Sequence, residues 1–290
     1  MTPVGKGGLR PSRRIGRAGL DVLRRRPGAR QVQGSSPAIR GGNNLYLWLW
    51  AHIARRDGER ALVLRSSTMD AWMQEFPVLR ELTLDEGDLR LLDARVFATR
   101  FFFDHDFTRE QCALFCRDLI SSSPSFRRRL ERARGLLTPE TCVVNVRRGD
   151  YYERAELTER FGIDVEHHVR EALELARERG RPTRDVLLVS DDVPWCLDAL
   201  RRCGSELWRV DPERRSPFDD LAVLASSTTL VLANSTFSYW GSYLAASRDA
   251  EHLAIAPSHH EITHDTGRIA PMFDPRWPRT SYCRLPGTLA

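Results

Sequence analysis

The sequence predicts an α/β protein made of two Rossmann-like lobes that face one cleft. In the second half of the chain, short apolar runs alternate with segments whose apolar residues recur at helical spacing. Polar clusters follow several of these runs, as they do at the carboxyl ends of parallel strands. The first half shows the same alternation more faintly. Strands that alternate with helices at this spacing imply right-handed βαβ units and a parallel sheet.

The second half, from residue 141 to residue 290, contains the clearest elements and is expected to form one lobe around a parallel sheet. Asp164 can cap one helix, and Ser216 followed by Pro217 marks the start of another. A third helix is predicted near Pro194, and residues 234–236 open a fourth. The apolar runs predict strands at residues 142–146, 186–189, 207–210, 230–233 and 252–256.

The first half is expected to contain a basic tail and the N-terminal lobe. Residues 1–38 are rich in Gly, Pro and Arg and are predicted to be disordered. Loose contact of this tail with a membrane or a polyanion is the alternative. Residues 39–140 are predicted to form the N-terminal lobe. Its elements are a glycine turn that opens a helix at residues 41–54, a strand at 60–65, and helices at 109–120 and 125–135.

Charge is distributed unevenly along the chain, and this limits the classes of partner. The formal net charge is +5, but residues 1–40 contain ten basic residues and one acid, so the rest of the chain carries −4. The body therefore offers no net basic surface to a nucleic acid. No apolar run is long enough to span a membrane, and none follows the basic N-terminus as in a secretory signal. We expect a cytoplasmic protein with at most peripheral membrane contact.

Six cysteines are scattered without the spacing of a metal site. No C-x-x-C pair occurs, and two cysteine pairs each share one face of a predicted helix. We interpret the cysteines as reduced structural thiols, and we predict neither a metal nor a cofactor. They are Cys112, Cys116, Cys142, Cys196, Cys203 and Cys283.

Three polar clusters follow predicted strands and form the candidate site. Because ligands bind beyond the carboxyl ends of parallel strands, the clusters are expected to lie together. The adjacent Arg147 and Arg148 can bind a diphosphate through planar, bidentate donors. The helix start at residues 234–236 offers backbone amides to the same anion. Asp191 or Asp192 could accept hydrogen bonds from the base or ribose of a nucleotide. The clusters are Arg147 to Asp150, Ser190 to Asp192, and Asn234, Ser235 and Thr236.

Each cluster also has a purely structural interpretation. The two arginines can be an exposed pair in an arginine-rich protein. One of the two aspartates can cap the helix near Pro194. Residues 234–236 are good N-cap residues and need no ligand.

One further motif suggests a different chemistry. Residues 260–264 read HEITH and match the H-E-x-x-H pattern of zinc proteases. That chemistry requires a regular helix, so that both histidines face one metal. This segment follows a predicted strand and is bounded by Pro257 and Gly267. We interpret it as a chance match in a polar loop. The doublet His167-His168 lies on a predicted helix, and one or both side chains are expected in solvent.

The clusters also support a family resemblance. Residues 143–150 read VVNVRRGD, and residues 230–245 read LVLANSTFSYWGSYLA. Together they resemble H-x-R-R-G-D and N-S-T-F-S-W-W-G, the hallmarks of the bacterial and animal α-1,2-fucosyltransferases, glycosyltransferase family 11. Residues 190–196 (SDDVPWC) resemble the S-D-D-x-x-W block of that family. Residues 42–46 (GNNLY) resemble its N-terminal glycine turn less closely. The motif order agrees from residue 40 to about residue 280.

The resemblance implies a GT-B-like enzyme that transfers L-fucose from GDP-fucose, with inversion and without a metal. The acceptor would be the 2-hydroxyl of a terminal galactose, on a bacterial cell-surface glycan or its lipid-linked precursor. By resemblance, Arg147 holds the β-phosphate of GDP, Arg148 supports the motif or the fucose, and Asp191 or Asp192 contacts guanine or ribose. The other donor-binding residues implied are Ser190, Asn234, Ser235 and Thr236, with Gly42 and Asn43 closing the cleft from the N-terminal lobe.

The departures from the family pattern leave alternatives open. Asn145 stands where the family has histidine, and Tyr239 precedes Trp240 in the second hallmark. A different nucleotide-sugar or acceptor, or a non-catalytic homologue that binds a nucleotide or glycan, would fit these changes. Inverting transfer usually needs a general base. Asp150 is the first candidate, and the others are Asp104, His105 and Asp106.

Overall fold

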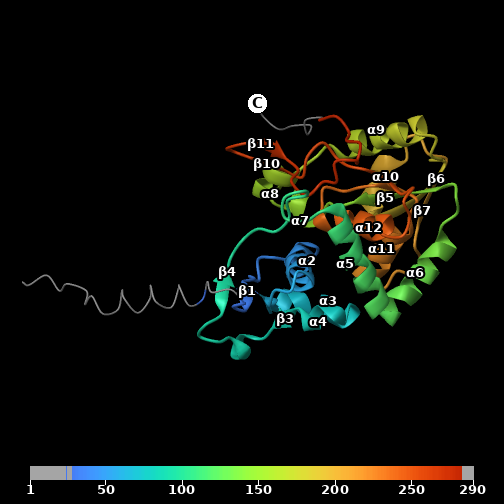
Figure 1. Ribbon diagram of the computed structural model, residues 1–290. Helices are drawn as coiled ribbons and strands as arrows, with labels where there is room; N and C mark the ends of the chain where they lie inside the picture. Colours follow the sequence, from blue (N-terminus) through green and yellow to red (C-terminus); the bar gives the residue numbers. More distant parts are fainter. Residues whose placement is uncertain (1–23, 25–27, 283–290) are drawn as a thin grey trace, which may run out of the picture.

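The computed structural model describes residue 24 and residues 28–282, and it contains two parallel sheets in one α/β arrangement (Figure 1). The first sheet has the strand order β3-β2-β1-β4. Its strands are β1 (Gln31–Gln33), β2 (Ala61–Leu64), β3 (Thr83–Leu84) and β4 (Ala94–Val96). Helix α2 (Asn43–Arg56) connects β1 to β2, and the short helices α3 (Asp70–Glu75) and α4 (Val78–Glu81) connect β2 to β3.

The prediction of a disordered tail up to residue 38 is wrong for residues 28–38. Strand β1 lies inside the sheet and pairs in parallel with both β2 and β4. Val32 is buried between two glutamines, so this three-residue strand has no apolar run that would show in the sequence. The rest of the predicted tail lies outside the described residues, apart from Arg24.

The second sheet has the strand order β7-β6-β5-β8-β9, and every pairing in it is parallel. Alternate residues of each strand point to opposite faces. Helices α9 and α10 cover one face, and α11 and α12 cover the other. The strands are β5 (Thr141–Val146), β6 (Asp185–Ser190), β7 (Leu207–Val210), β8 (Thr229–Val231) and β9 (Leu253–Ile255). The helices are α9 (Val165–Glu178), α10 (Val193–Leu200), α11 (Pro217–Ser226) and α12 (Thr236–Ala246). All five strands predicted for this half are confirmed.

Helices α5 (Arg109–Ser122) and α6 (Pro124–Leu136) join the two lobes. The sequence placed both in the N-terminal lobe, but α6 packs against α11 and α5 against α12, while α5 also contacts α2 and α4. One hydrophobic core therefore runs from α2 through α5 to the inner face of the second sheet. A lobe boundary at residue 140 divides the chain by sequence but does not divide this core.

The strand orders fix where a ligand crevice can form. In the first sheet the chain moves from β1 to β2 and β3 on one side, and β4 then returns to the other side of β1. In the second sheet the chain moves from β5 to β6 and β7, and β8 then returns to the other side of β5. Open α/β sheets bind ligands at such reversals, beyond the carboxyl ends of the strands.

Four smaller elements lie outside the two parallel sheets and their main helices. Helices α7 (Gly149–Glu153) and α8 (Ala155–Phe161) follow β5, and strands β10 (Glu261–Thr263) and β11 (Gly267–Ile269) form an antiparallel hairpin. The central three residues of the H-E-x-x-H segment therefore form a strand, where we expected a polar loop, and neither histidine lies on a helix. Among the described residues, no helix is long and apolar enough to cross a membrane. Five of the cysteines are free and buried, and Cys283 lies outside the described residues.

Candidate active site

Arg147 directly follows β5, at the reversal between β5 and β8. Its guanidinium forms ion pairs with Asp150 at 2.8 Å and with Asp191 at 3.0 Å. Burial disfavours the charge, but the neighbouring Asp191 and Asp150 outweigh this effect and raise the pKa of Arg147 above its ordinary value. The side chain is 41% exposed, so this permanent cation remains accessible at the strand end.

Arg148 has a different environment from its neighbour. Its guanidinium lies 3.6 Å from the ring centre of Trp195 and 4.7 Å from that of Tyr152, and its Nε donates to Asp192 at 3.1 Å. Only 19% of the side chain is exposed. Arg148 therefore ties the β5–α7 loop to the start of α10 through its Nε and through the face of its guanidinium.

The Ser190–Asp192 segment holds this arginine loop in place. Asp191 accepts a hydrogen bond from the backbone amide of Arg148 at 2.8 Å while it pairs with Arg147. Gly149 allows this approach, because a Cβ there would lie 2.5 Å from the Asp191 Oδ2. Asp192 caps α10 by accepting from the Trp195 amide at 3.3 Å. The structural interpretation of Asp192 is thus confirmed, whereas contact of either aspartate with a nucleotide stays a prediction.

The start of α12 lies beside this loop, after the adjacent strand β8. Ser235 occupies the N-cap position, but its side chain makes no capping hydrogen bond. The amides of the first turn are therefore left without the usual side-chain partner, at the positive end of an 11-residue helix. An anion placed between Arg147 and this helix start would be stabilised by both.

Asn234 connects the helix start to a cleft between the lobes. Its side-chain Nδ2 donates to the carbonyl oxygen of Phe161 and, at 3.4 Å, to that of His260. Both of these residues line the cleft. These hydrogen bonds of Asn234 hold two residues of the cleft wall in place. Asn234 itself is only 1% exposed, so its side-chain amide is not accessible to a ligand.

The interlobe cleft, as we call it, has a volume of about 560 Å³. The reversal between β1 and β4 opens into it from the first lobe, and α8 and the β10 strand face it from the second. The first-lobe wall is formed by residues 33–36, 38–39, 43, 46–47 and 97–101. The second-lobe wall is formed by Arg160, Phe161, His260, Glu261 and Met272.

Gly42 and Asn43 lie where the two lobes meet. Gly42 is buried against α12, and a Cβ at this position would lie 2.8 Å from the Thr236 backbone and 2.9 Å from the Trp240 ring. Asn43 is the first residue of α2 and lines the interlobe cleft. The structure therefore brings the N-terminal glycine turn against the helix start.

An aromatic contact links the arginine loop to the cleft. Arg147 lies 5.8 Å from the ring centre of Tyr151, and Tyr151 stacks on Phe161 at 4.9 Å. Phe161 in turn lines the cleft. Of the predicted site residues, Asn43 alone lines the cleft directly, and the arginine loop reaches it through these two rings.

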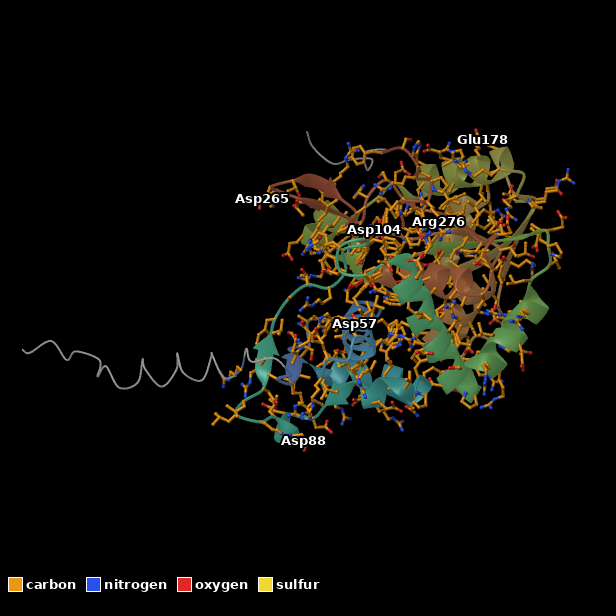
Figure 2. The ribbon with its side chains drawn as sticks, in the orientation of Figure 1. Asp57, Asp88, Asp104, Glu178, Asp265 and Arg276 are labelled. Atoms are coloured by element: carbon orange, nitrogen blue, oxygen red, sulfur yellow. The ribbon has the colours of Figure 1, made fainter. Side chains whose placement is uncertain are left out.

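The candidate bases occupy two different places. Asp150 is half-exposed and already paired with Arg147. Asp104, His105 and Asp106 form a turn ahead of α5, where Asp104 is labelled in Figure 2. None of these three lines the interlobe cleft. Asp150 does not line it either, but of the four candidates it is the one that lies beside Arg147 at the end of β5.

Several residues of the cleft were missed by sequence reasoning. Arg160 forms an ion pair with Glu261 at 2.5 Å, and buried His260 shares a hydrogen bond of 3.0 Å with the hydroxyl of Tyr239. Burial, with the positive charge of Arg160, lowers the pKa of His260 to about 3, so its imidazole is neutral at physiological pH. Arg160 lies on α8, and His260 and Glu261 lie at the start of β10. Neither of these short elements was predicted from the sequence, so a periodicity analysis could not have found these residues.

The two histidines of the α9 doublet differ. His168 is buried, and its ring nitrogens contact the Thr280 hydroxyl and the Leu232 carbonyl, each at 2.8 Å. His167 is half-buried and lies beside Glu171. One or both side chains were expected in solvent; His168 is buried, and His167 is partly exposed. Asn145 is also buried, and its side chain donates to the Val189 carbonyl at 2.9 Å, below the arginine loop.

No group of three or more His, Cys, Asp or Glu residues with metal-binding geometry occurs in the described part of the chain.

With this geometry established, comparison with known proteins identifies the family. Residues 82–277 match the model described as Glycosyl transferase family 11, which is more than half of the chain. The chain belongs to glycosyl transferase family 11. This family 11 protein is 31% identical, over 140 residues, to galactoside alpha-(1,2)-fucosyltransferase 1 of Saimiri sciureus and to that of Lagothrix lagotricha. Each alignment covers 47% of this chain and 37% of the relative.

Solved structures resemble the family 11 protein more weakly. POFUT1 in complex with GDP superposes with a TM-score of 0.44 at 12% identity, covering 80% of this chain and 98% of POFUT1. The E. coli heptosyltransferase WaaC with ADP-2-deoxy-2-fluoro heptose gives 0.37 at 14% identity, covering 83% of this chain and 92% of WaaC. The two-lobed α/β assignment accordingly depends on the strand orders described above.

Proposed function

We propose that this protein transfers L-fucose from GDP-fucose to the 2-hydroxyl of a terminal galactose on a glycan, with inversion and without a metal. Family membership and the fucosyltransferase activity by which the relatives are named support the reaction class. The observation that carries the proposal is the arrangement at the reversal between β5 and β8. There, Arg147 and the uncapped start of α12 follow neighbouring strands.

The reaction would use this arrangement to stabilise the leaving group. The acceptor oxygen forms a bond to C1 of fucose, the bond from C1 to the β-phosphate oxygen breaks, and its electron pair leaves with GDP. Arg147 and the amides of α12 would bind the charge that develops on the diphosphate, which stabilises the transition state more than the ground state.

Asp150 and Asp191 would have separate roles in this scheme. Asp191 also holds the Arg148 amide and would remain in place, whereas Asp150 is 52% exposed and can release Arg147 to the diphosphate. A released Asp150 carboxylate is the candidate to accept the proton of the acceptor hydroxyl. The cleft would receive the sugars, with Asn43 on one wall.

The proposal is tested by incubating the purified protein with GDP-fucose and lactose in the presence of EDTA. We expect GDP release and one product, whose NMR spectrum shows an α-linked fucose on O2 of galactose. A screen with GDP-mannose and UDP-sugars is the control for donor identity. Turnover with another donor alone, or GDP binding without turnover on any acceptor, would contradict the proposal.

A further inference from the structure

Arg100 lies beyond the end of β4, at the reversal between β1 and β4 in the first sheet, and it has no role in the proposed reaction. This residue follows β4 and lines the interlobe cleft from the first lobe. Its Nε donates to the Oε1 of Gln33 at 3.3 Å, and its guanidinium lies 4.8 Å from the ring centre of Trp50. The terminal nitrogens of Arg100 make no hydrogen bond to any described residue.

Gln33 holds Arg100 in a fixed orientation. Gln33 is 2% exposed, and its Nε2 donates to the carbonyls of Gly34 at 3.0 Å and Ala98 at 3.2 Å. The amide oxygen is thereby aimed at Arg100. A buried glutamine and an indole face thus orient a guanidinium whose outer edge is left for a ligand, which is the preorganised form of an anion-binding arginine.

The protein compensates the charge of Arg100 only in part. The other arginine of the cleft, Arg160, pairs with Glu261. Arg100 forms no ion pair with a carboxylate in the part of the chain that the structure describes. Burial lowers the pKa of Arg100, and the negative charge of Asp106 offsets this only in part. A partly buried, unpaired cation is costly, and a bound anion would remove that cost.

Aromatic rings lie next to this cation. Phe97 is 78% exposed, which is unusual for a phenylalanine, and its ring rests on Gly34, where a Cβ would lie 2.0 Å from the ring. Phe101 lines the same wall and stacks on Phe102 with the ring centres 5.2 Å apart. The exposed ring of Phe97 and the partly buried ring of Phe101 offer flat apolar contacts to a sugar ring.

We propose that Arg100, Phe97 and Phe101 form an acceptor subsite that selects glycans carrying an anionic group, a carboxylate or a phosphate, close to the reacting galactose. This proposal depends on the proposed function, which assigns the donor diphosphate to the second lobe and leaves the first-lobe wall to the acceptor. Gln33 and Trp50 act as positioning residues for Arg100.

The test compares three probes that share a galactosyl group: neutral lactose, lactobionate with its carboxylate, and galactose 1-phosphate with its phosphate. KM is measured for each with GDP-fucose, for the wild type, Arg100→Gln and the matched control Arg95→Gln. Arg95 is an exposed arginine of β4 that does not line the cleft. Arg100→Lys retains the charge and is expected to keep part of the preference, in case the glutamine variant is less stable.

We expect at least one anionic probe to show a KM about tenfold below that of lactose, because a charged hydrogen bond contributes on that order. This preference should be lost in Arg100→Gln and kept in Arg95→Gln, with GDP affinity unchanged in both. Lactobionate and galactose 1-phosphate distinguish carboxylate from phosphate recognition. Equal KM values for all three probes, or weaker GDP binding in Arg100→Gln, would overturn the subsite.

Calorimetry separates failure of this subsite from failure of the proposed function. If no probe is fucosylated, binding of lactobionate, galactose 1-phosphate and lactose is measured in the presence of GDP. Tighter binding of an anionic probe that is lost in Arg100→Gln would support the subsite without the reaction. Indistinguishable binding of the three probes would reject it.

Discussion

Arg147 and Arg148 are adjacent and chemically identical, but their surroundings give them different tasks. Arg147 is exposed at the end of β5 and is held by two carboxylates, one of which is on a half-exposed aspartate. Arg148 is enclosed by Trp195 and Tyr152 and pairs with Asp192. The first is suited to a ligand, and the second stabilises the loop that presents it.

The difference between the arginines predicts different effects on stability. Arg148→Ala removes the contact with Trp195 and the ion pair with Asp192, so the free energy of unfolding should fall by about 1–2 kcal/mol. Arg147→Ala should leave it nearly unchanged. Denaturant titrations of both variants measure this, and equal losses would contradict the assignment.

At this scale the sequence predicted where the polar residues lie but not what each one contacts. Strand periodicity and the position after a strand were enough to bring Arg147, Asp191 and Ser235 to one edge. The stacking of Arg148 on Trp195 and the capping by Asp192 depend on side-chain distances between separate loops. Those distances are set by packing, and a linear pattern does not contain them.

Among the elements, α2 and α12 make the contact that closes the site. Gly42 has φ −62°, which any residue adopts, so its requirement for glycine is steric and comes from the Thr236 backbone. The first turn of α12 is the same segment that would bind the diphosphate. The packing of these two helices therefore couples the first lobe to the donor site.

Gly42→Ala tests this contact. The added Cβ cannot be accommodated against the Thr236 backbone without moving α2, so we expect about 2 kcal/mol of destabilisation and weaker GDP binding. Gly135→Ala is the matched control, since nothing lies within 4 Å of a Cβ there and alanine favours the helix. Equal stability of the two variants in thermal melts would contradict the close approach.

Elements with long apolar runs were predicted well, and short ones were missed. The strands of the second sheet and the caps at Asp164 and Ser216 were expected from the sequence and are present. Strands β1 and β4 have three residues each and carry no periodic signal. Since these two strands border the first-lobe reversal, the existence of a cleft between the lobes could be predicted, but most residues of its first-lobe wall could not.

Across the whole molecule, four histidines, three of them buried and one half-buried, link stability to pH. Burial is the main cause that lowers the pKa of His168, His252 and His259 to about 4 and that of His260 to about 3, from an ordinary value of 6.5. The unfolded chain therefore binds protons more readily than the folded protein near pH 5 to 6. The stabilisation is fully present above pH 6.5 and is lost as the pH falls toward 4.

We accordingly expect the free energy of unfolding to fall between pH 7 and pH 5 in urea titrations. In His168→Gln the free energy of unfolding should fall less steeply with pH, because glutamine cannot take up the proton that His168 binds on unfolding. His252→Gln is the corresponding variant on the far side of the second sheet. A free energy that is constant over this range in the wild type would contradict the buried, neutral state of these rings.

The measurement that tests the central claim most directly is the calorimetric Kd for GDP of the wild type, Arg147→Ala and Arg154→Ala. Arg154 is the matched control, an exposed arginine paired with Glu156 nearby in the chain. Loss of a charge-assisted contact to the β-phosphate should raise the Kd of Arg147→Ala roughly thirtyfold or more, with no change for Arg154→Ala. An Arg147→Ala protein that binds GDP as tightly as the wild type would show that the diphosphate is held elsewhere.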